Sequence, residues 1–70
     1  MDWQILYAKV EEFIKERREV DWDELMEFMR NELGIREGLG YWGETVINVL
    51  LMKGKITIRE KYRYNGGENK

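Results

Sequence analysis

Four cationic side chains near the end of the chain follow the alternation of a β-strand. Lys55, Arg59, Lys61 and Arg63 occupy odd-numbered positions, and the positions between them hold mainly isoleucine and tyrosine. Because successive side chains of a strand point to opposite faces, the four cations are expected to share one surface. Lysine and arginine gathered in this way bind anions, and the phosphates of a nucleic acid are the leading candidate.

Residues suited to catalysis are largely missing from the sequence. It contains no histidine, cysteine or serine, so the common pairs of nucleophile and base cannot form. Without histidine or cysteine a structural zinc site is not expected. The glycine-rich segment 34–40 lacks the Lys-Ser/Thr pair of a phosphate-binding loop. We therefore expect a non-enzymatic protein with no catalytic residues, no cofactor, no bound metal and no small-molecule substrate.

The charges are divided unevenly along the chain. Residues 1–52 carry 12 acidic and 6 basic side chains, whereas residues 53–70 carry 6 basic and 2 acidic ones. A basic end is thus joined to an acidic body. The acidic residues before the basic end are interpreted as a solvated face, with a docking surface for a basic protein partner as the alternative. They include Glu12, Glu16, Glu19, Asp23, Glu27 and Glu32.

The length predicts one small domain over residues 1–64, followed by a flexible polar tail over residues 65–70. A domain of this size buries only about 60% of the surface that its unfolded chain exposes, so dense packing or self-association must support it. No apolar run reaches the roughly 20 residues that span a bilayer, and the N-terminus lacks a signal-peptide pattern. We expect no membrane association and a cytoplasmic location, including the nucleoid.

Two helices are predicted in the first half of the chain, from apolar residues at three- and four-residue intervals. The first begins after Asp2 and ends near Arg18. The second begins at Asp21, which is expected to form a capping box with Glu24. Gly34 is expected to end the second helix in a left-handed conformation.

A third helix and a β-hairpin are predicted in the second half. The helix runs from about residue 41 to residue 53 and ends at Gly54, and Gly43 marks a close helix crossing or the helix start. In residues 55–64, pairing Ile58 with Tyr62 keeps the apolar side chains on one face and leaves a three-residue tip at 59–61. One continuous strand is the alternative.

This order of elements resembles the winged helix-turn-helix family, over nearly the whole chain. The most specific segment is TVINVLLMKGKI, residues 45–56. In it, Ile47 and Leu50 lie seven and four residues before Gly54, and Ile56 lies two residues after it. The resemblance implies an α+β fold, a three-helix winged helix-turn-helix domain with a short C-terminal β-hairpin wing. The chain is similar in size and in its compact wing to winged-helix proteins from archaea, their plasmids and viruses. For a viral protein, the expected location would be the cytoplasm of the host.

The resemblance also implies binding to double-stranded DNA, as a transcriptional regulator or a small accessory factor of replication or transcription. The third helix of the family enters the major groove, and the wing follows the neighbouring backbone. The residues carried over for base edges are Tyr41, Thr45 and Asn48, and those for phosphates are Arg36, Lys53, Lys55, Arg59, Lys61 and Arg63. The chain departs from the family in its third helix, which has Glu44 and only one cation, Lys53.

Two interactions with other proteins are also expected. The first helix is long for this fold, so its first turns are expected to expose Trp3, with Leu6 or Tyr7, as a homodimer interface. Trp42 is expected to be half-buried against the second helix. The alternative to DNA binding is a winged-helix adaptor, which binds a larger protein complex without touching DNA.

Overall fold

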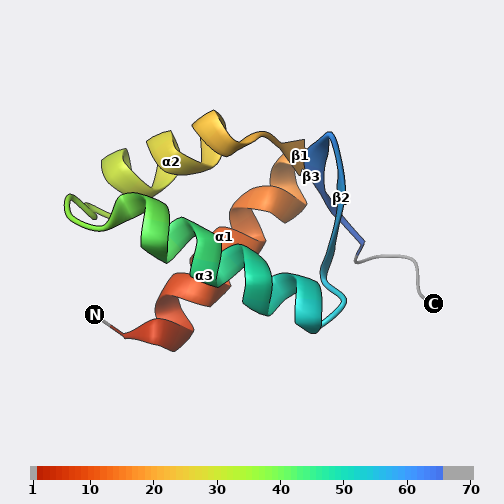
Figure 1. Cartoon of the computed structure of the whole chain (residues 1–70), viewed down its shortest axis with the longest axis horizontal. Helices are drawn as coiled ribbons and strands as arrows, with labels where there is room; N and C mark the ends of the chain where they lie inside the picture. Colours follow the sequence, from red (N-terminus) through yellow and green to blue (C-terminus); the bar gives the residue numbers. More distant parts are fainter. Residues whose placement is uncertain (1, 66–70) are drawn as a thin grey trace.

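The computed structural model describes residues 2–65 and shows an α+β fold of three helices and a small three-stranded antiparallel sheet (Figure 1). The elements are α1 (Trp3–Arg17), β1 (Glu19–Val20), α2 (Trp22–Asn31), α3 (Leu39–Met52), β2 (Ile56–Arg59) and β3 (Lys61–Tyr64). The β2–β3 hairpin lies at the opposite end of the molecule from the loop that joins α2 to α3 (Figure 1). No helix within residues 2–65 is long and apolar enough to cross a membrane.

The ends of α1 and α2 are set by the capping residues that the sequence predicts. Asp2 caps α1 through its side chain. At α2, Asp21 Oδ1 accepts a hydrogen bond from Glu24 N at 2.8 Å, and Glu24 Oε1 accepts one from Asp21 N at 2.9 Å. Gly34 has a φ of 71°, and Ile35 N donates to the carbonyl six residues earlier. The predicted capping box and left-handed stop are therefore confirmed.

Helix α3 begins at Leu39, two residues before the predicted start, because Gly38 adopts a φ of 66° and serves as the N-cap. Gly43 is buried where α3 crosses α2. A β-carbon at Gly43 would overlap the methyl end of Met26 and come within 3.2 Å of the Trp22 ring. The close helix crossing predicted from this glycine is confirmed.

The hairpin has the register that the sequence predicts. Ile56 lies opposite Tyr64, and Ile58 lies opposite Tyr62. Glu60 occupies the tip with a φ of 71°, a left-handed conformation that glycine usually supplies. The turn requires a positive φ at this position, and the tip contains no glycine, so Glu60 adopts the left-handed conformation.

A third strand, β1, was not predicted. It has only two residues and pairs antiparallel with β3, which gives the sheet order β1-β3-β2. Val20 is fully buried and lies opposite Tyr62, while Glu19 lies opposite Arg63. Two residues are too few for an alternating pattern to reveal a strand. Their pairing ties the hairpin to the connection between α1 and α2.

One hydrophobic core lies between the three helices and the sheet. It combines buried residues of α1, α2 and α3 with Val20 of β1, Ile35 of the loop and Ile56 of β2. The fully buried large side chains are Leu6, Val10, Ile14, Val20, Leu25, Met29, Val46 and Leu50. This packing fixes the positions of α3 and the hairpin relative to each other.

Asn65, the first residue of the predicted tail, is held by the hairpin. Its backbone N donates to Lys55 O at 2.8 Å, and its side-chain amide donates to Gly54 O at 3.3 Å. The Thr57 hydroxyl donates to Asn65 Oδ1 at 2.7 Å. Asn65 is thus tied to the hairpin, and residues 66–70 of the predicted tail lie outside the described residues.

Candidate functional site

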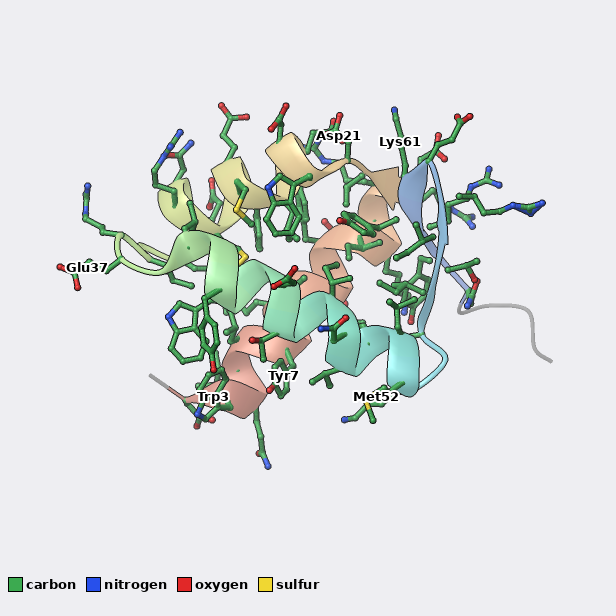
Figure 2. The ribbon with its side chains drawn as sticks, in the orientation of Figure 1. Trp3, Tyr7, Asp21, Glu37, Met52 and Lys61 are labelled. Atoms are coloured by element: carbon green, nitrogen blue, oxygen red, sulfur yellow. The ribbon has the colours of Figure 1, made fainter. Side chains whose placement is uncertain are left out.

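Three cations of the hairpin share one exposed face, as the alternation predicts. Arg59 lies directly opposite Lys61, and Arg63 lies opposite Thr57. All three cationic side chains are exposed. Figure 2 shows Lys61 at the tip end of the hairpin, with its side chain directed away from the helices. We call Arg59, Lys61 and Arg63 the cationic hairpin face.

Arg63 has an anionic partner within the chain. Its Nε lies 3.1 Å from Glu19 Oε1, because β1 places Glu19 opposite Arg63 on the neighbouring strand. Both side chains are about half exposed, and ion pairs of this kind contribute about 0–1 kcal/mol. Arg63 can therefore exchange Glu19 for a phosphate at little cost. Within residues 2–65, no carboxylate lies within ion-pair distance of Arg59 or Lys61.

Lys55 does not belong to the cationic hairpin face, contrary to the prediction. It precedes β2, so the alternation of the strand does not fix its direction. Its Nζ lies 3.5 Å from Glu11 Oε2 on α1. The Tyr64 hydroxyl donates to the same oxygen at 3.1 Å, so one carboxylate holds both ends of the hairpin base against α1. Burial, followed by this hydrogen bond to Glu11, raises the pKa of Tyr64.

The outward face of α3 is neutral to acidic. Tyr41 is 65% exposed, Asn48 is exposed and Thr45 is half-buried, so two of the three residues predicted to meet base edges are accessible. Residues 39–52 contain no cation, and Glu44 is exposed among them. Met52, at the last turn, is 87% exposed. This face therefore offers hydrogen-bonding and apolar groups, but no positive charge.

The two remaining predicted cations lie at the two ends of α3. Lys53 is the exposed C-cap of the helix, beside the start of the hairpin. Arg36 is exposed in the loop between α2 and α3, at the far end of the molecule from the hairpin (Figure 1). Lys53 thus lies at the base of the hairpin, at the opposite end of β2 from the Arg59–Lys61 tip, and Arg36 lies apart from the hairpin altogether (Figure 1).

The other face of the hairpin forms a surface that the sequence analysis did not identify as functional. Ile58 is 51% exposed, and the ring of Tyr62 packs edge-on against Trp22 of α2, with the ring centroids 6.5 Å apart. Burial raises the pKa of Tyr62, and the nearby carboxylate of Glu44 adds to this effect. The same alternation that predicts the cationic face places Ile58 and Tyr62 together, but it does not predict that Ile58 is exposed.

An aromatic cluster connects the first turns of α1 and α3. The ring centroids of Trp3 and Trp42 are 4.0 Å apart, those of Tyr41 and Trp42 are 5.1 Å apart, and those of Trp3 and Tyr7 are 6.0 Å apart. Trp42 is half-buried, as expected, and its ring packs against Trp3 of α1. Leu6 is only 2% exposed because it faces the core, which removes it from the predicted dimer surface. Trp3, at 39% exposure, and Tyr7 remain on that surface.

The described residues contain no group of three or more acidic side chains placed to hold a metal ion. Comparison of the chain with known protein families, with curated proteins and with solved structures finds no match.

Proposed function

We propose that this protein is a non-enzymatic winged-helix protein that binds double-stranded DNA, as a transcriptional regulator or an accessory factor of replication or transcription. In this proposal the β2–β3 hairpin is the wing and contacts backbone phosphates, and α3 lies in the major groove. The cationic hairpin face is the observation that carries the proposal. Its three cations project from one surface, and two of them make no ion pair within the described chain.

The arrangement of Arg59 and Lys61 favours an anionic partner. The two residues are directly opposite each other on neighbouring strands, where like charges repel. A phosphate between or beside them would relieve this repulsion. Lys53 lies at the end of α3 that leads into the hairpin, where it is exposed and can contact a further phosphate.

The neutral face of α3 limits how strongly the helix itself can bind DNA. Asn48 can form two hydrogen bonds with adenine, and Tyr41 is exposed at the first turn for contact with a base or sugar. Glu44 would repel phosphates on either side of the groove. We therefore expect modest affinity, in which most of the binding free energy comes from the wing.

Titration of a fluorescently labelled random duplex at several salt concentrations tests the proposal. Lys53, Arg59 and Lys61 are the three cations of this region without an ion pair within residues 2–65. If each neutralises one phosphate, log affinity should fall with log salt at a slope of about −2.7. A slope near zero, or no anisotropy change at about 50 mM salt, would exclude DNA contact through this face.

A protein adaptor is the second candidate, because of the apolar side chains exposed on α3 and on the adjoining face of the hairpin. Tyr41, Met52 and Ile58 are each more than half exposed, and exposed apolar groups of this size favour protein contacts. Glu44 on the same helix suits a partner with a basic residue. The duplex titration separates the two candidates, since an adaptor would leave random DNA unbound at low salt.

A further inference from the structure

A groove with acidic walls lies between α1 and α2. Its volume is about 400 Å³, and its lining includes Phe13 and Phe28, whose rings stack with centroids 4.1 Å apart and planes 9° apart. The carboxylates that line it come from both helices and are Glu16, Glu24, Glu27 and Glu32. The lining of the groove therefore combines aromatic rings with carboxylates.

Arg17 shows what kind of group this groove accommodates. Its guanidinium lies 5.0 Å from the centre of the Phe13 ring and 3.8 Å from Glu24 Oε2. This is the geometry in which a cation is stabilised by an aromatic face and a carboxylate together. The groove keeps its volume with Arg17 in place, because Arg17 lines one side of it.

Three of the four groove carboxylates remain available to a further cation. Within residues 2–65, Glu24 is the one groove glutamate with an ion-pair partner. The negative charges of Glu16, Glu27 and Glu32 are therefore not neutralised by a cation of the described chain. All three are exposed. The groove is thus equipped for a second arginine or lysine that arrives from outside.

The same chain carries the matching cations. Arg59 and Lys61 stand together at the tip end of the hairpin, exposed and without a carboxylate partner in the described part of their own chain. Their own groove is not their partner, since none of its glutamates lies within ion-pair distance of them. The cationic tip and the acidic groove are therefore two complementary surfaces, and within residues 2–65 of one copy they do not pair with each other.

We propose that the acidic groove between α1 and α2 binds the Arg59–Lys61 end of the hairpin of a second copy of this protein. One cationic side chain enters the groove beside Glu27 and Glu32. The contact joins two different surfaces, so it can either close into a small assembly or extend from copy to copy. This inference does not depend on DNA binding, because self-association is measured without DNA.

Sedimentation of the free protein tests the contact, at concentrations up to about 1 mM because a contact made mainly by exposed charges is weak. Three double variants are compared with the unmodified chain. The groove variant is Glu27→Lys with Glu32→Lys, and the tip variant is Arg59→Glu with Lys61→Glu. The control variant, Glu12→Lys with Glu37→Lys, changes two other exposed glutamates and has the same net charge as the groove variant.

The unmodified chain and the control variant should associate at about 50 mM salt and dissociate at about 200 mM. The groove and tip variants should each stay monomeric at the lower salt concentration, and an equimolar mixture of the two should associate again, since both contacts are then attractive. Circular dichroism checks that each variant folds. If the groove variant does not fold, Glu27→Gln with Glu32→Gln replaces it, matched by Glu12→Gln with Glu37→Gln.

Three results would overturn the proposal. The first is a monomeric unmodified chain at about 1 mM protein and low salt. The second is an equal loss of association in the groove and control variants, which would indicate an effect of net charge alone. The third is a mixture of the groove and tip variants that stays monomeric. Duplex binding by the folded groove variant is a separate measurement, so failure of either proposal leaves the other testable.

Discussion

Removing the two charges at the end of the hairpin should make DNA binding less dependent on salt. The change is Arg59→Ala combined with Lys61→Ala. Both side chains are exposed and make no ion pair within residues 2–65, so their loss removes charge without leaving a partner unsatisfied. The two alanines also remove a repulsive cross-strand pair, so the free energy of unfolding should stay equal or rise slightly.

The size of the effect follows from the number of cations that remain. With Lys53, Arg59 and Lys61 each neutralising one phosphate, affinity should fall about 40-fold when salt rises from about 50 to about 200 mM. With Lys53 alone, the slope should be about −0.9, and the same change in salt should lower affinity only about 3-fold. The difference between the two proteins is thus largest at low salt and shrinks as salt is added.

The assay is anisotropy of a labelled random duplex, titrated with each protein at four or more salt concentrations within this range. A second double variant, Lys9→Ala with Arg30→Ala, serves as the matched control. It removes one lysine and one arginine from exposed positions on α1 and α2, outside the candidate site. Its slope should equal that of the unmodified chain.

Either of two results would refute the reasoning. If both double variants lost salt dependence to the same extent, net charge would govern binding and the hairpin would have no special role. If the hairpin variant kept a slope near −2.7, the phosphates would be neutralised by other cations.

Three further predictions concern stability. Asp21→Ala removes the acceptor for Glu24 N and should lower the thermal midpoint by about 4–8 °C, the effect of about 1 kcal/mol in a domain of this size; calorimetry that finds no change would contradict the role of the cap. Tyr64 has a raised pKa in the folded protein, so the folded state keeps a proton that the unfolded state loses above about pH 10, and stability should fall as pH rises through this range. Thermal melts from about pH 9 to about pH 11 should show a shallower fall in Tyr64→Phe, and an identical fall would show that Tyr64 does not contribute. Gly43→Leu should lower the free energy of unfolding by about 1–3 kcal/mol, because the new side chain must displace Met26 and Trp22. Urea denaturation measures this change, and unchanged stability would mean that α2 and α3 can move apart without cost.

Much of the fold could be predicted because local signals in the sequence agree with the final packing. The capping box at Asp21 and the left-handed glycine at position 34 act within a few residues of each other, so the structure reproduces them. The hairpin register followed from face parity, since any shift by one residue would place cations among the apolar side chains. The start of α3 was harder to predict, because the segment 34–40 contains three glycines and any of them could precede the helix. In the structure Gly38 is the N-cap.

The candidate site was less predictable because its contacts join residues far apart in the sequence. Glu19 partly neutralises Arg63 only because the short strand β1 pairs with β3, and two residues leave no periodic signal. Lys55 has the right parity for the cationic face, but lies outside the strand in which parity applies, and so it reaches Glu11. The groove lined by Phe13 and Phe28 likewise exists only where α1 and α2 meet.

The placement of the tryptophans gives the protein its own optical reporters. Trp3 and Trp42 are close enough and inclined enough, at 4.0 Å and 54°, to produce an exciton couplet in circular dichroism, which registers the docking of α1 on α3. Trp22 instead touches Tyr62 on the hairpin, so its emission responds when the hairpin shifts. The couplet therefore reports on the helical body, and the part of the tryptophan emission that comes from Trp22 reports on the hairpin.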